Sequence, residues 1–318
     1  MSVIRFSLTL VATTLVGVQL VAQSGQTPVR TAMPAFKSSA TQVAVTAAVR
    51  QPNGTPVTTL RREDFEIYDN GRPRPIGSFW SEPSIASVVV LFDRSGSMRL
   101  GNKIEIARDA TSQLLGWLDA GKDEVSLLGF DRDVSRLSPF VPVPGRVMRD
   151  LENVDAYGTT ALLDAMAVGA REVTERRTRR GVVVLTDGLD TGSTWTSAQV
   201  ARLAAGIDVP VYVVVAQLAV DRETLSANTT STLSDLAKAT GGEVFVVTTP
   251  TEALIATKAI ASDLHHQYLM AFASDGTPGW HALDVRVKQQ KLLVRARTGY
   301  DAGADPASRV ITSFRNER

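Results

Sequence analysis

The stretch VVVLFDRSGSM, residues 88–98, indicates the fold around which the chain is organised. Its apolar residues, Val88 to Phe92, include β-branched and aromatic types, which is typical of a strand buried on both faces. Asp93, Ser95 and Ser97 then follow at alternate positions, and a sharp turn could aim their oxygens at one point. Ligands of open α/β sheets lie at the carboxyl ends of strands, so the pattern favours a small divalent cation. A plain strand-to-helix N-cap is the alternative.

Two later stretches offer further oxygens of the same kind. In YGTTALLDA, residues 157–165, Gly158 permits a tight turn and two hydroxyls precede an apolar helical pattern. In VVVLTDG, residues 182–188, a second buried strand ends in Asp187 and Gly188. The sequence therefore predicts three loops at strand or helix ends, each of which presents oxygen ligands.

The three motifs, in this order, resemble the metal-ion-dependent adhesion site of von Willebrand factor A domains, and the resemblance covers about residues 83 to 262. It implies that Mg²⁺ or Mn²⁺ is surrounded by Asp93, Ser95, Ser97, Thr160 and Asp187. The family often reads Gly-Gly-Thr where this chain reads Gly158-Thr159-Thr160, so the implied ligand is Thr160 rather than Thr159. The resemblance also implies an adhesion mechanism, in which a Glu or Asp carboxylate of a partner protein completes the ion's coordination.

Beyond residue 100, helical and strand patterns alternate along the chain. Helices are predicted over 103–117, 146–153, 161–175, 196–205, 233–239 and 251–265, and strands over 125–130, 182–185, 209–216 and 243–247. Residues 134–137 fit a short antiparallel edge strand. This alternation predicts an α/β fold with a doubly wound, mostly parallel sheet, as in the Rossmann-like von Willebrand factor A domain.

Alternating strand patterns flank this domain on both sides. Residues 42–49 and 64–71 alternate before it, the second running into Asn70-Gly71, a strong hairpin signal. Residues 283–287 and 294–297 alternate after it. Because a few two-sided strands rarely stand alone, we expect residues 41–82 and 266–300 to pair into one small β-sandwich with the main domain inserted between them. The DFEIYDNG and RARTGY segments resemble a bacterial secreted subgroup of the same superfamily.

The arginines of the last strand have two interpretations. Arg295 and Arg297 alternate with apolar residues, which predicts a solvated strand face. A binding patch formed together with Tyr300 is the alternative.

The N-terminus reads as a secretory signal. Arg5 precedes the mostly apolar segment 6–21, and Ala22 ends a plausible cleavage site. We therefore expect a secreted or periplasmic protein without a membrane span after cleavage; an uncleaved N-terminal anchor is the alternative. The predicted division is a signal peptide (1–22), a flexible linker (23–40), an N-terminal β segment (41–82), the von Willebrand factor A domain (83–262), a C-terminal β segment (263–300) and a tail (301–318).

The composition excludes some classes of function. The 318 residues are 44% hydrophobic and 21% charged, with 34 basic and 33 acidic side chains, so no nucleic-acid partner is implied. The chain has no cysteine, which removes disulfides and thiolate metal sites.

The resemblance and the composition favour an exported, metal-dependent protein-binding or adhesion module. The alternatives are an envelope structural or assembly protein whose metal braces the loops, and a metal-dependent hydrolase. Catalysis is disfavoured because no P-loop or G-x-S-x-G motif occurs, and because His265, His266 and His281 are expected at the surface or in caps.

Overall fold

The computed structural model describes residues 42–142, 145–152, 154–206, 208–218, 227–289 and 291–302. The expected signal peptide and linker lie outside these residues, as does most of the expected tail. Among the described helices, none has the length and the apolar character needed to cross a bilayer.

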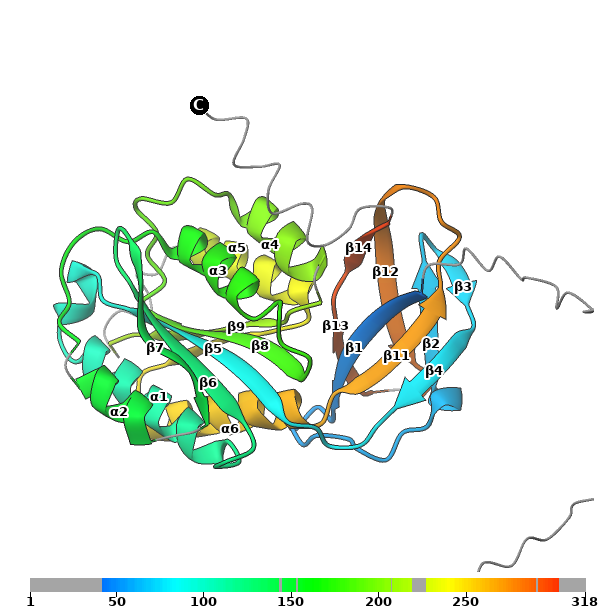
Figure 1. Ribbon diagram of the computed structural model, residues 1–318, viewed down its shortest axis with the longest axis horizontal. Coiled ribbons are helices and arrows are strands. Elements are labelled where there is room, and N and C mark those ends of the chain that lie inside the picture. Colours follow the sequence, from blue (N-terminus) through cyan, green and yellow to red (C-terminus); the bar gives the residue numbers. More distant parts are fainter. Residues whose placement is uncertain are drawn as a thin grey trace, which may run out of the picture. The chain divides into compact units, whose positions relative to one another are not determined.

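Residues 86–247 contribute a six-stranded sheet, drawn in Figure 1. Its order is β10-β9-β8-β5-β6-β7, and every pairing is parallel except that of β7 with β6. The strands are β5 (Ala86–Asp93), β6 (Glu124–Phe130), β7 (Val134–Pro142), β8 (Arg179–Thr186), β9 (Val211–Ala216) and β10 (Val244–Val247). All eight residues of β5 are buried, as its apolar sequence predicts. The antiparallel edge strand is also confirmed, and it extends to Pro142.

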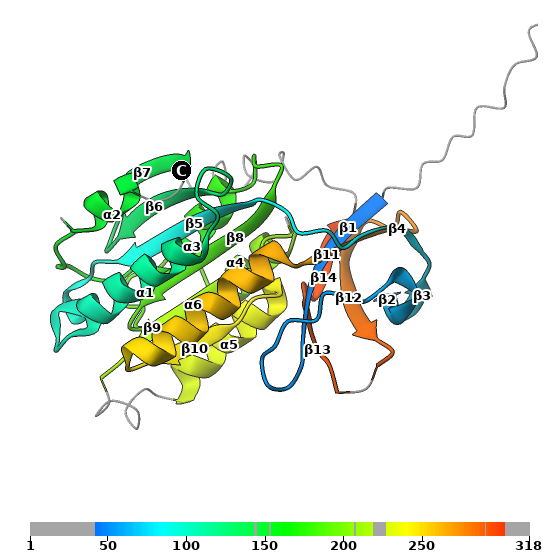
Figure 2. The ribbon, with the colours of Figure 1, turned by 90° about the horizontal axis from the view of Figure 1, so that it is seen from below.

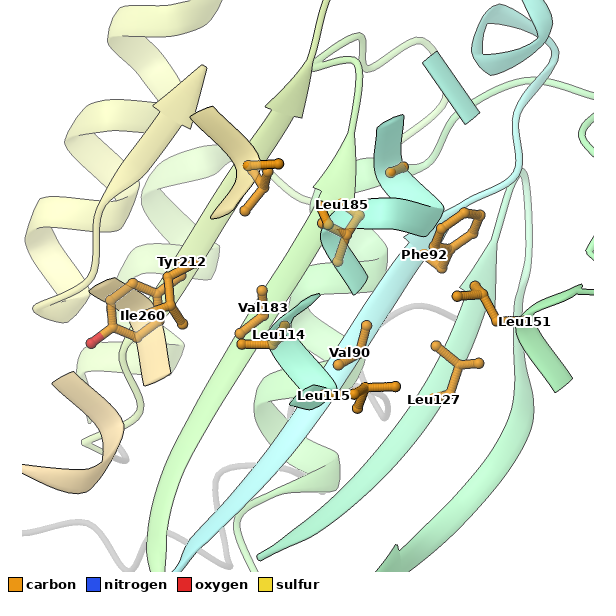
Figure 3. Close-up of a cluster of buried hydrophobic side chains, with 14 of the residues drawn as sticks. Val90, Phe92, Leu114, Leu115, Leu127, Leu151, Val183, Leu185, Tyr212 and Ile260 are labelled. Carbon is orange, nitrogen blue, oxygen red and sulfur yellow. The ribbon is translucent and has the colours of Figure 1, made fainter. Parts of the chain in front are cut away.

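Helices cover both faces of this sheet. They are α1 (Lys103–Trp117), α2 (Gly145–Glu152), α3 (Leu162–Glu172), α4 (Ser197–Gly206), α5 (Ala227–Thr240) and α6 (Pro250–His265). Helices α1 and α6 lie along one face of the sheet (Figure 2). Side chains of α1, α2 and α6 pack into one core with Phe92 and Tyr212 of the sheet (Figure 3). Those of α3, α4 and α5 pack into a second core on the other face. The doubly wound α/β fold is therefore confirmed.

The strand order locates a binding edge. The chain runs from β5 to β6 on one side and later adds β8 on the other side, so the order reverses next to β5. In open α/β sheets, ligands bind outside the carboxyl ends of the strands at such a switch point. The carboxyl ends of β5 and β8 therefore mark the place where a site is expected.

The flanking segments pair with each other, as predicted. One four-stranded sheet has the order β13-β1-β11-β4 and another has the order β14-β12-β2-β3. Their strands are β1 (Gln42–Arg50), β2 (Phe65–Asp69), β3 (Arg72–Arg74), β4 (Ile76–Trp80), β11 (Tyr268–Ala273), β12 (Gly279–Val287), β13 (Leu293–Ala296) and β14 (Gly299–Ala302). Both sheets contribute to one apolar core, so they form a sandwich.

The α/β domain is inserted into this sandwich. It follows β4 and precedes β11, and these two strands pair antiparallel, with Trp80 opposite Leu269. The last helix, α6, continues to His265, so the expected domain boundary at residue 262 falls within its last turn. The Asn-Gly hairpin is present between β2 and β3, where Asn70 (φ 50°) and Gly71 (φ 76°) both take the left-handed conformation that this turn requires.

The expectation that Arg295 and Arg297 face solvent is wrong. Arg297 is buried, and its Nη1 donates a hydrogen bond to the Ala205 carbonyl at 2.7 Å. Arg295 is half-buried, and its Nη2 donates to Glu243 Oε1 at 2.6 Å. Alternation along a strand distinguishes its two faces, but it does not say which other elements cover each face.

Candidate metal centre

The two predicted carboxylate ligands lie at the same edge of the sheet. Asp93 ends β5, Asp187 directly follows β8, and these parallel strands are neighbours. Both residues are buried. Thr186 Oγ1 donates a hydrogen bond of 2.6 Å to Asp93 Oδ2, which joins the two strand ends. The two carboxylates that the sequence predicts as ligands are therefore close together, as a shared metal site requires.

The two predicted serine ligands fold back onto Asp93. The backbone N–H of Ser95 donates to Asp93 Oδ1 at 2.8 Å, and the Oγ atoms of Ser95 and Ser97 lie 3.1 Å apart. Ser97 belongs to a short 3₁₀ helix, η2 (Gly96–Arg99), which turns the chain immediately after β5. The D-x-S-x-S motif therefore concentrates three oxygen-bearing side chains in one turn.

The Thr160 loop closes the gap between the other two loops. Gly158 adopts φ +94°, and its carbonyl accepts a hydrogen bond of 3.1 Å from the N–H of Gly96. On the other side, the Thr160 carbonyl accepts from the N–H of Gly192 at 2.9 Å, in the loop that follows Asp187. Because these bonds tie all three loops together, the five predicted ligand residues gather at one edge. Their role as metal ligands stays a prediction.

Asp93 is a buried carboxyl whose ionised form is disfavoured by its surroundings. Burial raises the pKa of the Asp93 carboxyl to about 6, against the hydrogen bonds from Thr186 and Ser95, and the charge of Asp187 raises it further. Two carboxylates and three hydroxyls are also the hard oxygen donors that Mg²⁺ and Mn²⁺ prefer. The donor set thus fits a divalent cation, which would stabilise the ionised form of Asp93.

Two residues at this edge were not given a role by sequence reasoning. Thr186 connects the two strand ends through its hydroxyl. Lys103, the first residue of α1, places Nζ 3.2 Å from Asp187 Oδ2. The available signal for Lys103 was a cationic side chain at the start of a helix, where the helix dipole disfavours positive charge.

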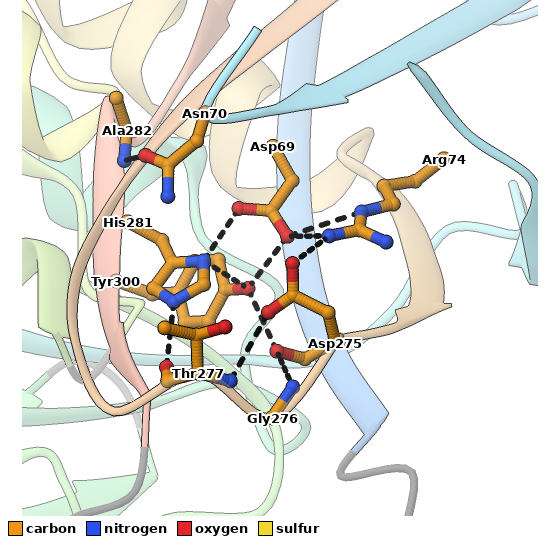
Figure 4. Close-up of polar contacts among 10 residues, drawn as sticks. Asp69, Asn70, Arg74, Asp275, Gly276, Thr277, His281, Ala282 and Tyr300 are labelled. Carbon is orange, nitrogen blue, oxygen red and sulfur yellow. Dashed lines mark hydrogen bonds and ion pairs between the residues drawn. The ribbon is translucent and has the colours of Figure 1, made fainter. Parts of the chain in front are cut away.

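A second group with metal-binding side chains lies in the sandwich (Figure 4). Ligand atoms of Asp69, Asp275 and His281 lie within 4.8 Å of one another. However, Arg74 Nη2 lies 3.0 Å from Asp69 Oδ2 and also pairs with Asp275. Tyr300 Oη donates to Asp69 Oδ2 at 3.1 Å. These partners neutralise and hydrogen-bond the carboxylates, so we interpret the group as an ionic network that joins β2, β3, β12 and β14.

The histidine of this network lies between two acceptors that favour its charged form. His281 Nε2 lies 2.8 Å from the Thr277 carbonyl, which can only accept, so Nε2 carries a proton. Nδ1 lies 2.7 Å from Asp69 Oδ1, and a second proton is needed between them. Burial opposes the charged ring, but the hydrogen bonds to Asp69 and Thr277 outweigh it and raise the pKa of His281. The expected surface or capping position is wrong for His281, which is 2% exposed.

The fold and the oxygen cluster define a doubly wound α/β domain with an oxygen-lined site at its switch point. Residues 88–189 match the family model of the von Willebrand factor type A domain, which supports a domain of this type in that part of the chain.

Solved structures with similar folds include BatB from Bacteroides thetaiotaomicron, which is 20% identical and covers 56% of this chain and 98% of that chain with a TM-score of 0.47. A von Willebrand factor type A protein from Catenulispora acidiphila is 13% identical and covers 83% of this chain and 75% of that chain with a TM-score of 0.45. Among curated proteins, none matches this chain.

Proposed function

We propose that this chain is an exported protein-binding module that depends on a divalent metal. The residues that would hold Mg²⁺ or Mn²⁺ are Asp93, Ser95, Ser97, Thr160 and Asp187. When bound, the ion would supply a Lewis acid for one oxygen of a Glu or Asp carboxylate on a partner protein. Export is part of the proposal, supported by the apolar segment 6–21 that follows Arg5.

The observation that carries the proposal is an apolar rim around this edge. Leu100 is 62% exposed, Tyr157 59% and Leu189 42%. Each stands two or three residues from a predicted metal ligand, and each belongs to a different one of the three loops. Exposed apolar groups beside a charged centre are typical of protein interfaces, where they exclude water from the central polar contact. The rim therefore supports a protein partner.

The three histidines are not placed to act as a catalytic base beside the candidate ion. His265 Nε2 lies 2.7 Å from Asp123 Oδ2, and His266 Nδ1 lies 3.0 Å from the Ser262 carbonyl, both at the end of α6. His281 belongs to the sandwich network described above. A metal-dependent hydrolase needs a positioned base beside its ion, and these three rings are held elsewhere. The proposal accordingly includes no enzymatic activity.

We expect Mn²⁺ to bind the wild-type chain and to raise its unfolding temperature, and Asp187→Asn to abolish both effects. Removing one carboxylate takes away half of the formal negative charge that attracts the ion. Binding is measured by isothermal titration, and stability by thermal unfolding with Mn²⁺ or with a chelator. Asp190→Asn is the matched control, because Asp190 is in the same loop and its Oδ1 accepts from the Leu162 N–H, as an Asn carbonyl also can.

A glutamate-containing peptide and its glutamine counterpart then test the open coordination position. The proposal expects the glutamate peptide alone to bind, and only in the presence of Mn²⁺. Wild-type protein that fails to bind Mn²⁺ contradicts the proposal. Metal binding that stabilises the fold without any metal-dependent carboxylate binding favours the alternative of a bracing ion in a structural protein.

The apolar rim makes a separate prediction. Leu189→Ser should weaken metal-dependent binding of the natural partner about tenfold, because a well-packed interface residue is worth more than about 1 kcal/mol. Its affinity for Mn²⁺ should not change. Surface plasmon resonance with the partner captured in Mg²⁺ provides the measurement. Ile255→Ser is the control, since Ile255 is 64% exposed on α6 and should have no effect. Equal losses in both variants would refute a role for the rim.

A further inference from the structure

The structure places an ammonium group inside the candidate metal centre. Lys103 Nζ lies 3.2 Å from Asp187 Oδ2, and the two side chains are only 11% and 1% exposed. Lys103 begins α1, and three residues separate it from η2, the turn that carries Ser97. This cation therefore enters the site from the same segment as three of the five predicted ligands.

The contact with Asp187 compensates part of the cost of burying Lys103. A lysine at the first position of a helix opposes the positive end of the helix dipole. Removing an ammonium from water is also unfavourable unless a partner compensates it. The Asp187 carboxylate supplies that compensation. The pair thus keeps the loop after β8 attached to the start of α1 through a charge–charge contact.

The position of this ammonium bears on any divalent cation bound by Asp93 and Asp187. Lys103 already neutralises one of the two carboxylates. A divalent ion would bring two further positive charges to within a few ångströms of Nζ, where the repulsion is only weakly screened. When the site binds the ion, either the repulsion weakens binding or the ammonium group of Lys103 moves away from Asp187.

We propose that Lys103 is a built-in counter-ion that competes with the metal for Asp187. Without metal it holds the Asp187 loop in its bonded position, so the site keeps its shape. With metal it lowers the affinity below that of the oxygen ligands alone. The metal then exchanges with solution, and the site responds to the free concentration of divalent cations. This inference rests on the proposed function, since it concerns the same ion.

The test compares Lys103→Met with wild type. Methionine keeps the length and the apolar stem of lysine but removes its charge. We expect Mn²⁺ and Mg²⁺ to bind Lys103→Met about tenfold more tightly by isothermal titration, a change expected for one nearby charge at a partly buried site. In chelator the unfolding temperature of the variant should fall, and the increase on adding Mn²⁺ should exceed that of wild type.

Control variants separate the possible outcomes. Lys103→Arg keeps the charge and should keep the wild-type affinity, and Lys258→Met removes an exposed lysine on α6 and should change nothing. If Lys103→Met folds only in the presence of metal, that dependence supports the proposal. The metal affinity of a neutral variant is then measured with Lys103→Gln. Unchanged or weaker metal binding by both neutral variants overturns the competition while leaving the proposed function intact. No metal binding by any variant overturns both.

Discussion

We expect Gly242→Ala to lose about 4 kcal/mol of unfolding free energy, near the upper end of single-substitution effects. Gly241 and Gly242 close α5: Gly241 adopts φ +87°, and the N–H of Gly242 donates to the Ala237 carbonyl at 2.8 Å. Gly242 lies directly against the start of β9, where a Cβ atom would overlap the backbone oxygen and carbon of Val211. The obstructing atoms are main chain in a central strand, so they cannot move aside as a side chain would.

Urea denaturation followed by circular dichroism measures this loss. The matched control is Gly116→Ala in α1, where a Cβ atom meets nothing within 4 Å. There the same substitution should stabilise the protein by about 0.5–1 kcal/mol, because alanine favours the helix and restricts the unfolded chain. A loss below about 1 kcal/mol for Gly242→Ala would show that the contact between α5 and β9 is not as close as described.

We expect the unfolding temperature of the wild-type protein to fall as the pH rises from 6.5 to 9, and His281→Gln to remove this dependence. The pKa of His281 is raised above its ordinary value of 6.5 in the folded state. Its contribution to stability is therefore complete below pH 6.5 and is lost as the pH rises through the folded pKa. At pH 6.5, losing the charged hydrogen bonds should cost about 2 kcal/mol.

Thermal unfolding across this pH range tests the prediction. The range begins at 6.5 because the raised pKa of Asp93 acts at lower pH. His266→Gln is the control: His266 is half-buried and contacts the Ser262 carbonyl, and its replacement should preserve the wild-type profile. A slope retained in His281→Gln would assign the dependence to another group.

Most of the fold could be predicted because its signals are local. The apolar runs that form β5 and β8 end at polar turns, and the Asn70-Gly71 pair specifies its hairpin without reference to distant residues. Arg297 could not be placed from its neighbours along the chain. Its partners include the carbonyls of Ala205 and Ala44, which come close only after both domains have formed.

In the candidate site too, some features follow from local sequence and others depend on distant residues. The D-x-S-x-S turn and the Thr-Asp pair gather at one edge because β5 and β8 are parallel neighbours, and the sequence pattern predicts that arrangement. Lys103 and His281 were not recognised because their burial depends on carboxylates far away in sequence, Asp187 and Asp69. A single lysine or histidine forms no periodic pattern from which such a partner could be predicted.

The insertion of one domain into another has a consequence for synthesis. Strand β1 lies between β11 and β13, so Gln42 must wait for Ala273 to be made before it can pair. At ribosomal rates of about 5–20 residues per second, that delay lasts roughly ten to fifty seconds. During this time β1 has both hydrogen-bonding edges open to other chains, the situation in which strands aggregate. A nascent chain halted after α6 would contain every strand of the six-stranded sheet and still carry this hazard.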